Sequence, residues 1–92
     1  MIHPMEIGTA RGLANHIIEE GEVELSDHAQ KEFADEDPPM DILDAVNLIQ
    51  RAKMTHQYRN GEHRYRFETP RMAVVVVFES ETYLRVVTGW RK

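Results

Sequence analysis

Apolar residues in the first half of the chain recur at the three- and four-residue spacing of amphipathic helices. The stretch 9–20 predicts a first helix, whose apolar face consists of Ala10, Leu13, Ala14 and Ile17. Gly21 is suited to end this helix in a left-handed conformation. Ser26 is a good N-cap for a second short helix that carries Ala29 and Phe33.

A third helix is expected after the run 35–39, because its two consecutive prolines end the second helix. Asp37 or its neighbour is the expected cap of this third helix. Its apolar stripe consists of Ile42, Ala45, Val46 and Ile49, and its end is expected near Ala52. The alternating segment 22–25, between the first two helices, can form a brief extended piece.

The second half of the chain predicts a sheet. Asn60 and Gly61 tolerate the positive φ of a two-residue hairpin turn, and alternating segments flank them. Such a turn pairs Arg59 with Glu62, Tyr58 with His63, Gln57 with Arg64 and His56 with Tyr65. The side chains expected to face the helices are Met54, His56, Tyr58, His63, Tyr65 and Phe67. The opposite face carries Gln57, Arg59, Glu62, Arg64 and Arg66.

Two further strands complete the expected sheet. Residues 72–78 are apolar on both faces, as in a central strand that is covered on both sides, and residues 83–90 form the last strand. We therefore predict an α+β fold, in which N-terminal helices pack on one face of a twisted, mainly antiparallel sheet of about four strands. A length of 92 residues with 41% hydrophobic content supports a single domain over residues 1–92.

Charge is distributed unevenly along the chain. Residues 1–50 contain twelve acidic and two basic side chains, whereas residues 51–92 contain nine basic and four acidic ones. The net charge of −5 therefore hides a basic C-terminal half. Seven basic residues on the expected strands and turns could form one surface for a polyanion: Arg59, Arg64, Arg66, Arg71, Arg85, Arg91 and Lys92.

Composition also narrows the cellular setting. The chain has no cysteine, which excludes disulfides, thiol nucleophiles and thiolate metal sites. No apolar run reaches the roughly 18 residues that span a bilayer, and the N-terminal stretch lacks the basic and apolar regions of a signal peptide. We expect a soluble, cytoplasmic protein with no membrane partner.

Several short motifs resemble a known group of proteins. Ser26-Asp27-His28-Ala29 opens the second helix and is followed by Phe33-Ala34, and the second half contains the segments 62–66, 74–78 and 84–88. Together they resemble an uncharacterised family of small bacterial domains with a Ser-x-His-Ala start. That family is grouped with the RelE, HigB and BrnT ribonuclease toxins of toxin–antitoxin systems. The chain departs from that family at 36–39, where acids and prolines replace an Arg-Gly-Ile-Ser stretch. Its acidic pI of about 5.5 is a second departure.

The resemblance implies a RelE- or barnase-like fold and metal-free cleavage of RNA, including mRNA on the ribosome, with no cofactor. It also implies a cognate antitoxin, or another protein, as partner. In such cleavage a base removes the ribose 2′-hydroxyl proton, cations stabilise the pentacoordinate phosphate, and an acid protonates the leaving 5′-oxygen. Arginine suits the second role because its planar fork binds two phosphate oxygens.

The candidate catalytic residues are His28, Arg64, Arg66 and Thr88. The candidate RNA-binding residues are Arg59, Arg85, Trp90, Arg91 and Lys92, and Trp90 or Tyr83 could stack on a base. Each has a structural alternative, since a histidine can pack beside its cap, arginines can pair with neighbouring glutamates, and a tryptophan can cover the core edge. For His56 and His63 a hydrogen-bonded structural role is favoured over zinc ligation.

Two functional hypotheses follow. The first is a small endoribonuclease of the toxin type, neutralised by a partner antitoxin. The alternative is a non-catalytic regulator or phage-type inhibitor, whose acidic helices occupy a basic protein surface. Growth arrest and RNA cleavage on production in a bacterium would separate the two.

Overall fold

The computed structural model describes residues 3–92. The helices in this part of the chain are α1 (Ile7–Glu20), α2 (Asp27–Asp35) and α3 (Ile42–Arg51). The strands are β1 (Glu22–Leu25), β2 (Lys53–Arg59), β3 (Glu62–Glu68), β4 (Met72–Ser80) and β5 (Tyr83–Arg91). Met1 and Ile2, which belong to the stretch examined for a signal peptide, lie outside the described residues.

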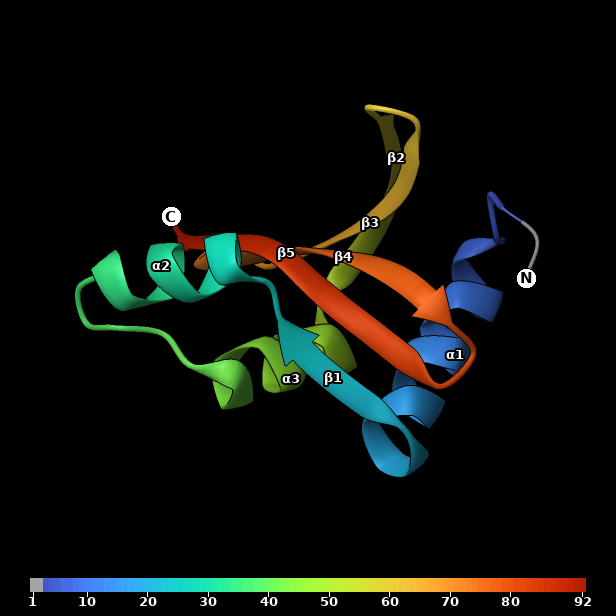
Figure 1. The fold of residues 1–92 in the computed structure, drawn as a ribbon, viewed down its shortest axis with the longest axis horizontal. Helices are drawn as coiled ribbons and strands as arrows, with labels where there is room; N and C mark the ends of the chain where they lie inside the picture. Colours follow the sequence, from blue (N-terminus) through green and yellow to red (C-terminus); the bar gives the residue numbers. More distant parts are fainter. Residues whose placement is uncertain (1–2) are drawn as a thin grey trace.

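The predicted α+β fold is confirmed: helices pack on one face of a mainly antiparallel sheet with the strand order β1-β5-β4-β3-β2 (Figure 1). β1 runs parallel to β5, and every other neighbouring pair is antiparallel. The sheet has five strands rather than about four, because residues 22–25 pair along β5, with Glu22 opposite Tyr83. None of the helices within residues 3–92 is long and apolar enough to cross a membrane.

The main core lies between the helices and the sheet face that they cover. Alternation along the strands places Tyr65 and Phe67 of β3, and Val74 and Val76 of β4, in this layer, where all four are fully buried. The helical side chains that meet them include Ala14, Ile17, Phe33, Leu48 and Ile49. The central position of β4, which the apolar run 72–78 predicts, is confirmed.

A second, smaller apolar cluster lies on the other face of the sheet. It consists of Val75 and Val77 from β4 and Val87 from β5, with the half-buried Trp90 packed against it. The rest of this face carries polar and charged side chains, and the candidate site lies among them.

The β2–β3 hairpin has the predicted turn and register. Asn60 has a φ of 54° and Gly61 a φ of 75°, and Arg59 pairs with Glu62. The expected burial of Tyr58 is wrong, because its side chain is 63% exposed. The hairpin end extends beyond the helices (Figure 1), so residues near the turn have no helical layer to pack against.

Two helix boundaries differ from the sequence expectations. Gly21 follows α1 with a φ of −117°, so it is not left-handed. A glycine is needed there for another reason: a Cβ atom would lie 2.4 Å from the Thr82 carbonyl oxygen in the β4–β5 turn. The cap of α3 is Asp41 rather than Asp37, since Asp41 and Asp44 form a reciprocal capping box.

Candidate RNA-binding and cleavage site

A cavity of about 810 Å³ lies on the sheet face opposite to the main core. We call it the arginine cavity after four of the side chains that line it: Arg59, Arg64, Arg66 and Arg85. Its lining also includes His28 and Glu32 from α2, Glu62 from β3, and Thr88 and Trp90 from β5. Four arginines against two glutamates give the lining a formal net charge of +2, although the whole chain carries −5.

The hairpin register places the first arginines in this cavity. Tyr65 and Phe67 are fully buried in the main core, so strand alternation directs Arg64 and Arg66 to the opposite face. Arg59 reaches the same cavity from β2, across the turn. The sequence grouping of these three arginines on one face therefore agrees with their positions in the fold.

A β-bulge decides which residues of β5 join them. Val75 pairs with Thr88 but Val76 pairs with Val86, so Val87 is an extra residue in β5. The bulge reverses the alternation beyond Val87. Arg85 before it and Thr88 after it consequently both line the arginine cavity.

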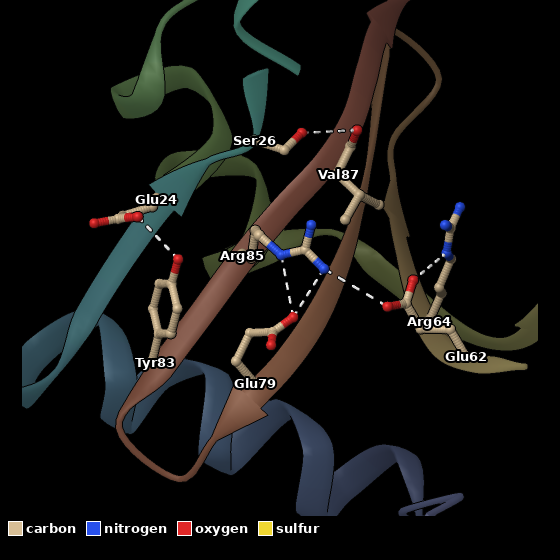
Figure 2. A network of polar contacts seen from close by, with 8 residues as sticks. All are labelled: Glu24, Ser26, Glu62, Arg64, Glu79, Tyr83, Arg85 and Val87. Atoms are coloured by element: carbon tan, nitrogen blue, oxygen red, sulfur yellow. Dashed lines mark hydrogen bonds and ion pairs between the residues drawn. The ribbon is translucent and has the colours of Figure 1, made fainter. Parts of the chain in front are cut away.

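Ion pairs orient two of these arginines, Arg64 and Arg85. Arg85 Nη2 lies 2.8 Å from Glu79 Oε1 and 3.6 Å from Glu62 Oε2. Arg64 Nε donates to Glu62 Oε1 at 3.0 Å, so Glu62 lies between two guanidinium groups (Figure 2). The exposed fractions of these four side chains lie between 24% and 36%. Ion pairs that are this accessible to water contribute little to the stability of the fold. Their consequence is orientation of the guanidinium groups toward one face.

An imidazole and a carboxylate meet at the edge of the cavity. Ser26 caps α2 by accepting a hydrogen bond from the Ala29 amide, and its hydroxyl donates to the Val87 carbonyl at 3.2 Å. This contact docks the start of α2 on the bulge of β5. In the first turn of α2, His28 Nε2 lies 2.8 Å from Oε1 of Glu32, which is one turn further along the helix. Glu32 Oε1 also accepts a hydrogen bond from the Thr88 hydroxyl.

Arg66 packs against the Trp90 ring on one side of the cavity. The Arg66 guanidinium carbon lies 4.9 Å from the centre of the Trp90 ring, within the range of a cation–π contact. Arg66 Nη2 also donates to Glu68 at 3.2 Å, while its buried Nε has no hydrogen-bond partner among the described residues. An unsatisfied donor of this kind favours an additional acceptor in the cavity.

The structure brings together seven of the nine residues selected from the sequence. Arg91 lies elsewhere, in a smaller cavity of about 180 Å³ that also includes Arg51 and Arg71, because the bulge turns it to the other face. Lys92 pairs with Glu68, and the hydrogen bond from Lys92 lowers the pKa of the Glu68 carboxyl. Arg91 and Lys92, which were grouped with Arg59, Arg85 and Trp90 from the sequence, therefore do not line the arginine cavity.

Sequence reasoning also missed two participants. Glu32 is not among the candidate residues, although its four-residue spacing from His28 on a helix places the two side chains on one face. Glu62 was assigned to the correct face, but its contact with Arg85 depends on the distant pairing of β4 with β5. Only the first of these carries a local sequence signal.

The histidines on the core-facing side of the hairpin form a separate group. His56 Nε2 and His63 Nδ1 are hydrogen-bonded at 2.8 Å, and His3 stacks on His63 with ring centroids 5.1 Å apart. Within residues 3–92 no three His, Asp or Glu side chains are grouped as metal ligands would be. Comparisons of the chain with models of protein families, with curated proteins and with solved structures give no match.

Proposed function

We propose that this protein binds RNA in the arginine cavity and cleaves it without a metal ion, as an endoribonuclease of the toxin type. The observation that carries the proposal is the convergence of four arginines, the His28–Glu32 pair and Trp90 on one cavity. These residues come from three separate parts of the chain, and the Val87 bulge is needed to bring them together.

Binding would rest on the arginines and the tryptophan. Arg64 and Arg66 stand on one face of β3, and their guanidinium groups can exchange a glutamate partner for phosphate oxygens. The partly exposed Trp90 ring, already in contact with Arg66, offers a surface on which an unstacked base can lie. This combination suits single-stranded RNA, whose bases are free to stack on side chains.

The chemistry would begin at His28. With its Nε2–H donated to Glu32, the ring has a lone pair on Nδ1, which can take the proton of a ribose 2′-hydroxyl. The 2′-oxygen then bonds to phosphorus and the bond from phosphorus to the 5′-oxygen breaks. Arg64 and Arg66 stabilise the added negative charge, and water in the open cavity protonates the leaving oxygen. The products are a 2′,3′-cyclic phosphate and a 5′-hydroxyl.

The test is cleavage of single-stranded RNA by the purified protein in the presence of EDTA. We expect product ends that carry a 2′,3′-cyclic phosphate, and no cleavage where a 2′-deoxynucleotide occupies the cut position. His28→Ala and Glu32→Gln should each lower the cleavage rate by a factor of about 100 or more, as expected for loss of a general base and of its orienting group.

A double variant, Lys31→Ala with Lys53→Ala, is the matched control. Both lysines are exposed and lie outside the cavity lining, so cleavage should stay at the level of the unmodified protein. Binding of RNA without any cleavage would contradict the catalytic proposal, and the absence of both binding and cleavage would favour the alternative of a non-catalytic, protein-binding regulator. Production in a bacterium should arrest growth, and a cognate inhibitor would act by covering the arginine cavity.

A further inference from the structure

A second cavity, of about 720 Å³, lies between β1, α2 and the start of α3. We call it the edge groove. Its apolar lining includes Val23 and Leu25 of β1, Phe33 of α2, and Met40 and Ile42 around the start of α3. Ile42 is 36% exposed and the adjacent Leu43 is 65% exposed, so apolar surface continues beyond the groove. None of these side chains belongs to the arginine cavity.

The edge groove runs along an open edge of the sheet. Within residues 3–92, β1 pairs only with β5, so its other edge has no strand beside it (Figure 1). The Glu22 amide donates to the Thr82 carbonyl just before β5, and the Ser26 amide donates to the Val86 carbonyl of β5. Because hydrogen-bonding directions alternate along a strand, Val23 and Leu25 direct their backbone groups to the open edge. The Leu25 carbonyl accepts a hydrogen bond from the Gln30 side chain at 3.2 Å instead.

Negative charge accompanies this edge. Glu22 and Glu24 alternate with the two apolar residues of β1, and both carboxylates are exposed. A hydrogen bond between them, together with their mutual repulsion, raises the pKa of the Glu22 carboxyl. Asp41 lies at the groove, and residues 1–50 carry twelve acidic side chains against two basic ones. Positive charge brought to this edge would relieve the repulsion.

We propose that the open edge of β1 binds an extended segment of a partner protein in which apolar and basic residues alternate. The segment adds a sixth strand to the sheet, with main-chain hydrogen bonds to the backbone of Val23 and to the amide of Leu25. Its apolar side chains enter the edge groove, while its lysines or arginines on the other face meet Glu22 and Glu24. This surface is independent of the proposed cleavage of RNA.

The probe is a short peptide in which valine and lysine alternate, with valine–glutamate and threonine–lysine peptides for comparison. We expect saturable binding of the valine–lysine peptide by calorimetry, and at least about tenfold weaker binding of the other two, because each loses one half of the contact. Amide hydrogen exchange should slow at Val23 and Leu25 on binding. A peptide with N-methylated amides on its pairing edge should not bind.

Charge reversal tests the edge itself. Glu22→Lys combined with Glu24→Lys should lower the affinity for the valine–lysine peptide at least about tenfold. The same variant should raise the affinity for the valine–glutamate peptide. Glu6→Lys combined with Glu19→Lys changes the net charge equally at exposed positions of or beside α1, and should leave the affinity unchanged. If charge reversal unfolds the protein, Glu22→Gln with Glu24→Gln is measured instead.

Two results would overturn the proposal. One is binding that is equal for the edge variant and the control variant, or that leaves hydrogen exchange at Val23 and Leu25 unchanged. The other is slow exchange at these two amides that depends on protein concentration without any peptide, which would make a second copy of this chain the occupant. Loss of RNA cleavage would affect neither outcome, because the peptide measurements do not use the arginine cavity.

Discussion

Gly89 lies on the core-facing side of β5 because the Val87 bulge reverses the alternation of the strand. A Cβ atom at Gly89 would lie 2.5 Å from the Phe33 ring and 2.9 Å from Val74. Gly89→Ala should therefore lower the free energy of unfolding by about 1–3 kcal/mol, the usual cost of overpacking a core. Urea denaturation followed by circular dichroism measures the change.

The matched control is Gly12→Ala in the interior of α1. Nothing lies within 4 Å of a Cβ atom at this position, and alanine is the better helix former. The same measurement should show that Gly12→Ala increases the free energy of unfolding by up to about 1 kcal/mol. Equal effects of the two substitutions would contradict the close approach of β5 to Phe33.

The element that fixes the arginine face is the β2–β3 hairpin. Gly61 has a φ of 75°, where a β-branched side chain is strained. Gly61→Val should lower the free energy of unfolding by on the order of 1 kcal/mol or more, whereas Gly61→Asn should cost clearly less, since asparagine tolerates this region. Thermal unfolding of both variants distinguishes turn strain from loss of a glycine alone.

The segment before α1 is attached to the hairpin through Tyr65 of β3. Tyr65 is hydrogen-bonded to His3 Nδ1 and to the Met5 amide, each at 2.9 Å. Burial, with the nearby His63 and His56, lowers the pKa of His3 below its ordinary 6.5. The unfolded chain then binds more protons, so this stabilisation is present above about pH 6.5 and is lost as pH falls toward the lowered pKa.

The midpoint temperature of thermal unfolding should consequently decrease as the pH is lowered from 7 to 5. The dependence of this temperature on pH should be shallower in His3→Gln. His16→Gln is the control, because His16 is exposed on α1 and should leave the slope unchanged. An identical pH dependence in all three proteins would rule out this contribution from His3.

Local signals made much of the fold predictable. Ser26 as a cap, the Asn60–Gly61 turn and the register from Gln57 to Arg64 all follow from residues close together in the sequence. The parallel pairing of β1 and the Val87 bulge do not, because both depend on contacts between distant segments. Alternation alone would have placed Trp90 on the core-facing side of β5, away from Arg85. The grouping of Arg59, Arg64 and Arg66 was thus predictable from local register, whereas the positions of Arg85, His28 and Trp90 beside them depend on contacts between distant segments.

At the scale of the whole molecule, acidic side chains are concentrated in the first half of the sequence and basic side chains in the second half. The net charge of −5 opposes binding of a polyanion, so the local +2 lining of the arginine cavity must overcome it. RNA affinity should therefore depend steeply on salt and on individual cavity arginines.

Arg64→Ala combined with Arg66→Ala should weaken binding of single-stranded RNA and reduce the slope of log affinity against log salt by about 1.4, if each arginine contacts one phosphate. Lys31→Ala with Lys53→Ala removes the same charge elsewhere and should preserve the slope. Fluorescence anisotropy at several salt concentrations gives both quantities. An unchanged slope in the arginine variant would exclude this face as the RNA site.

The position of β5 also has a consequence for synthesis of the chain. β5 is the last strand of the described sequence, yet it lies between β1 and β4 and contributes Arg85, Thr88 and Trp90. While the protein emerges from the ribosome, β1 remains unpaired and the candidate site lacks one wall until residues 83–90 are available. The nascent chain therefore completes its sheet and its arginine cavity in the same late step. Pairing across so many residues also slows folding relative to a fold built from local contacts.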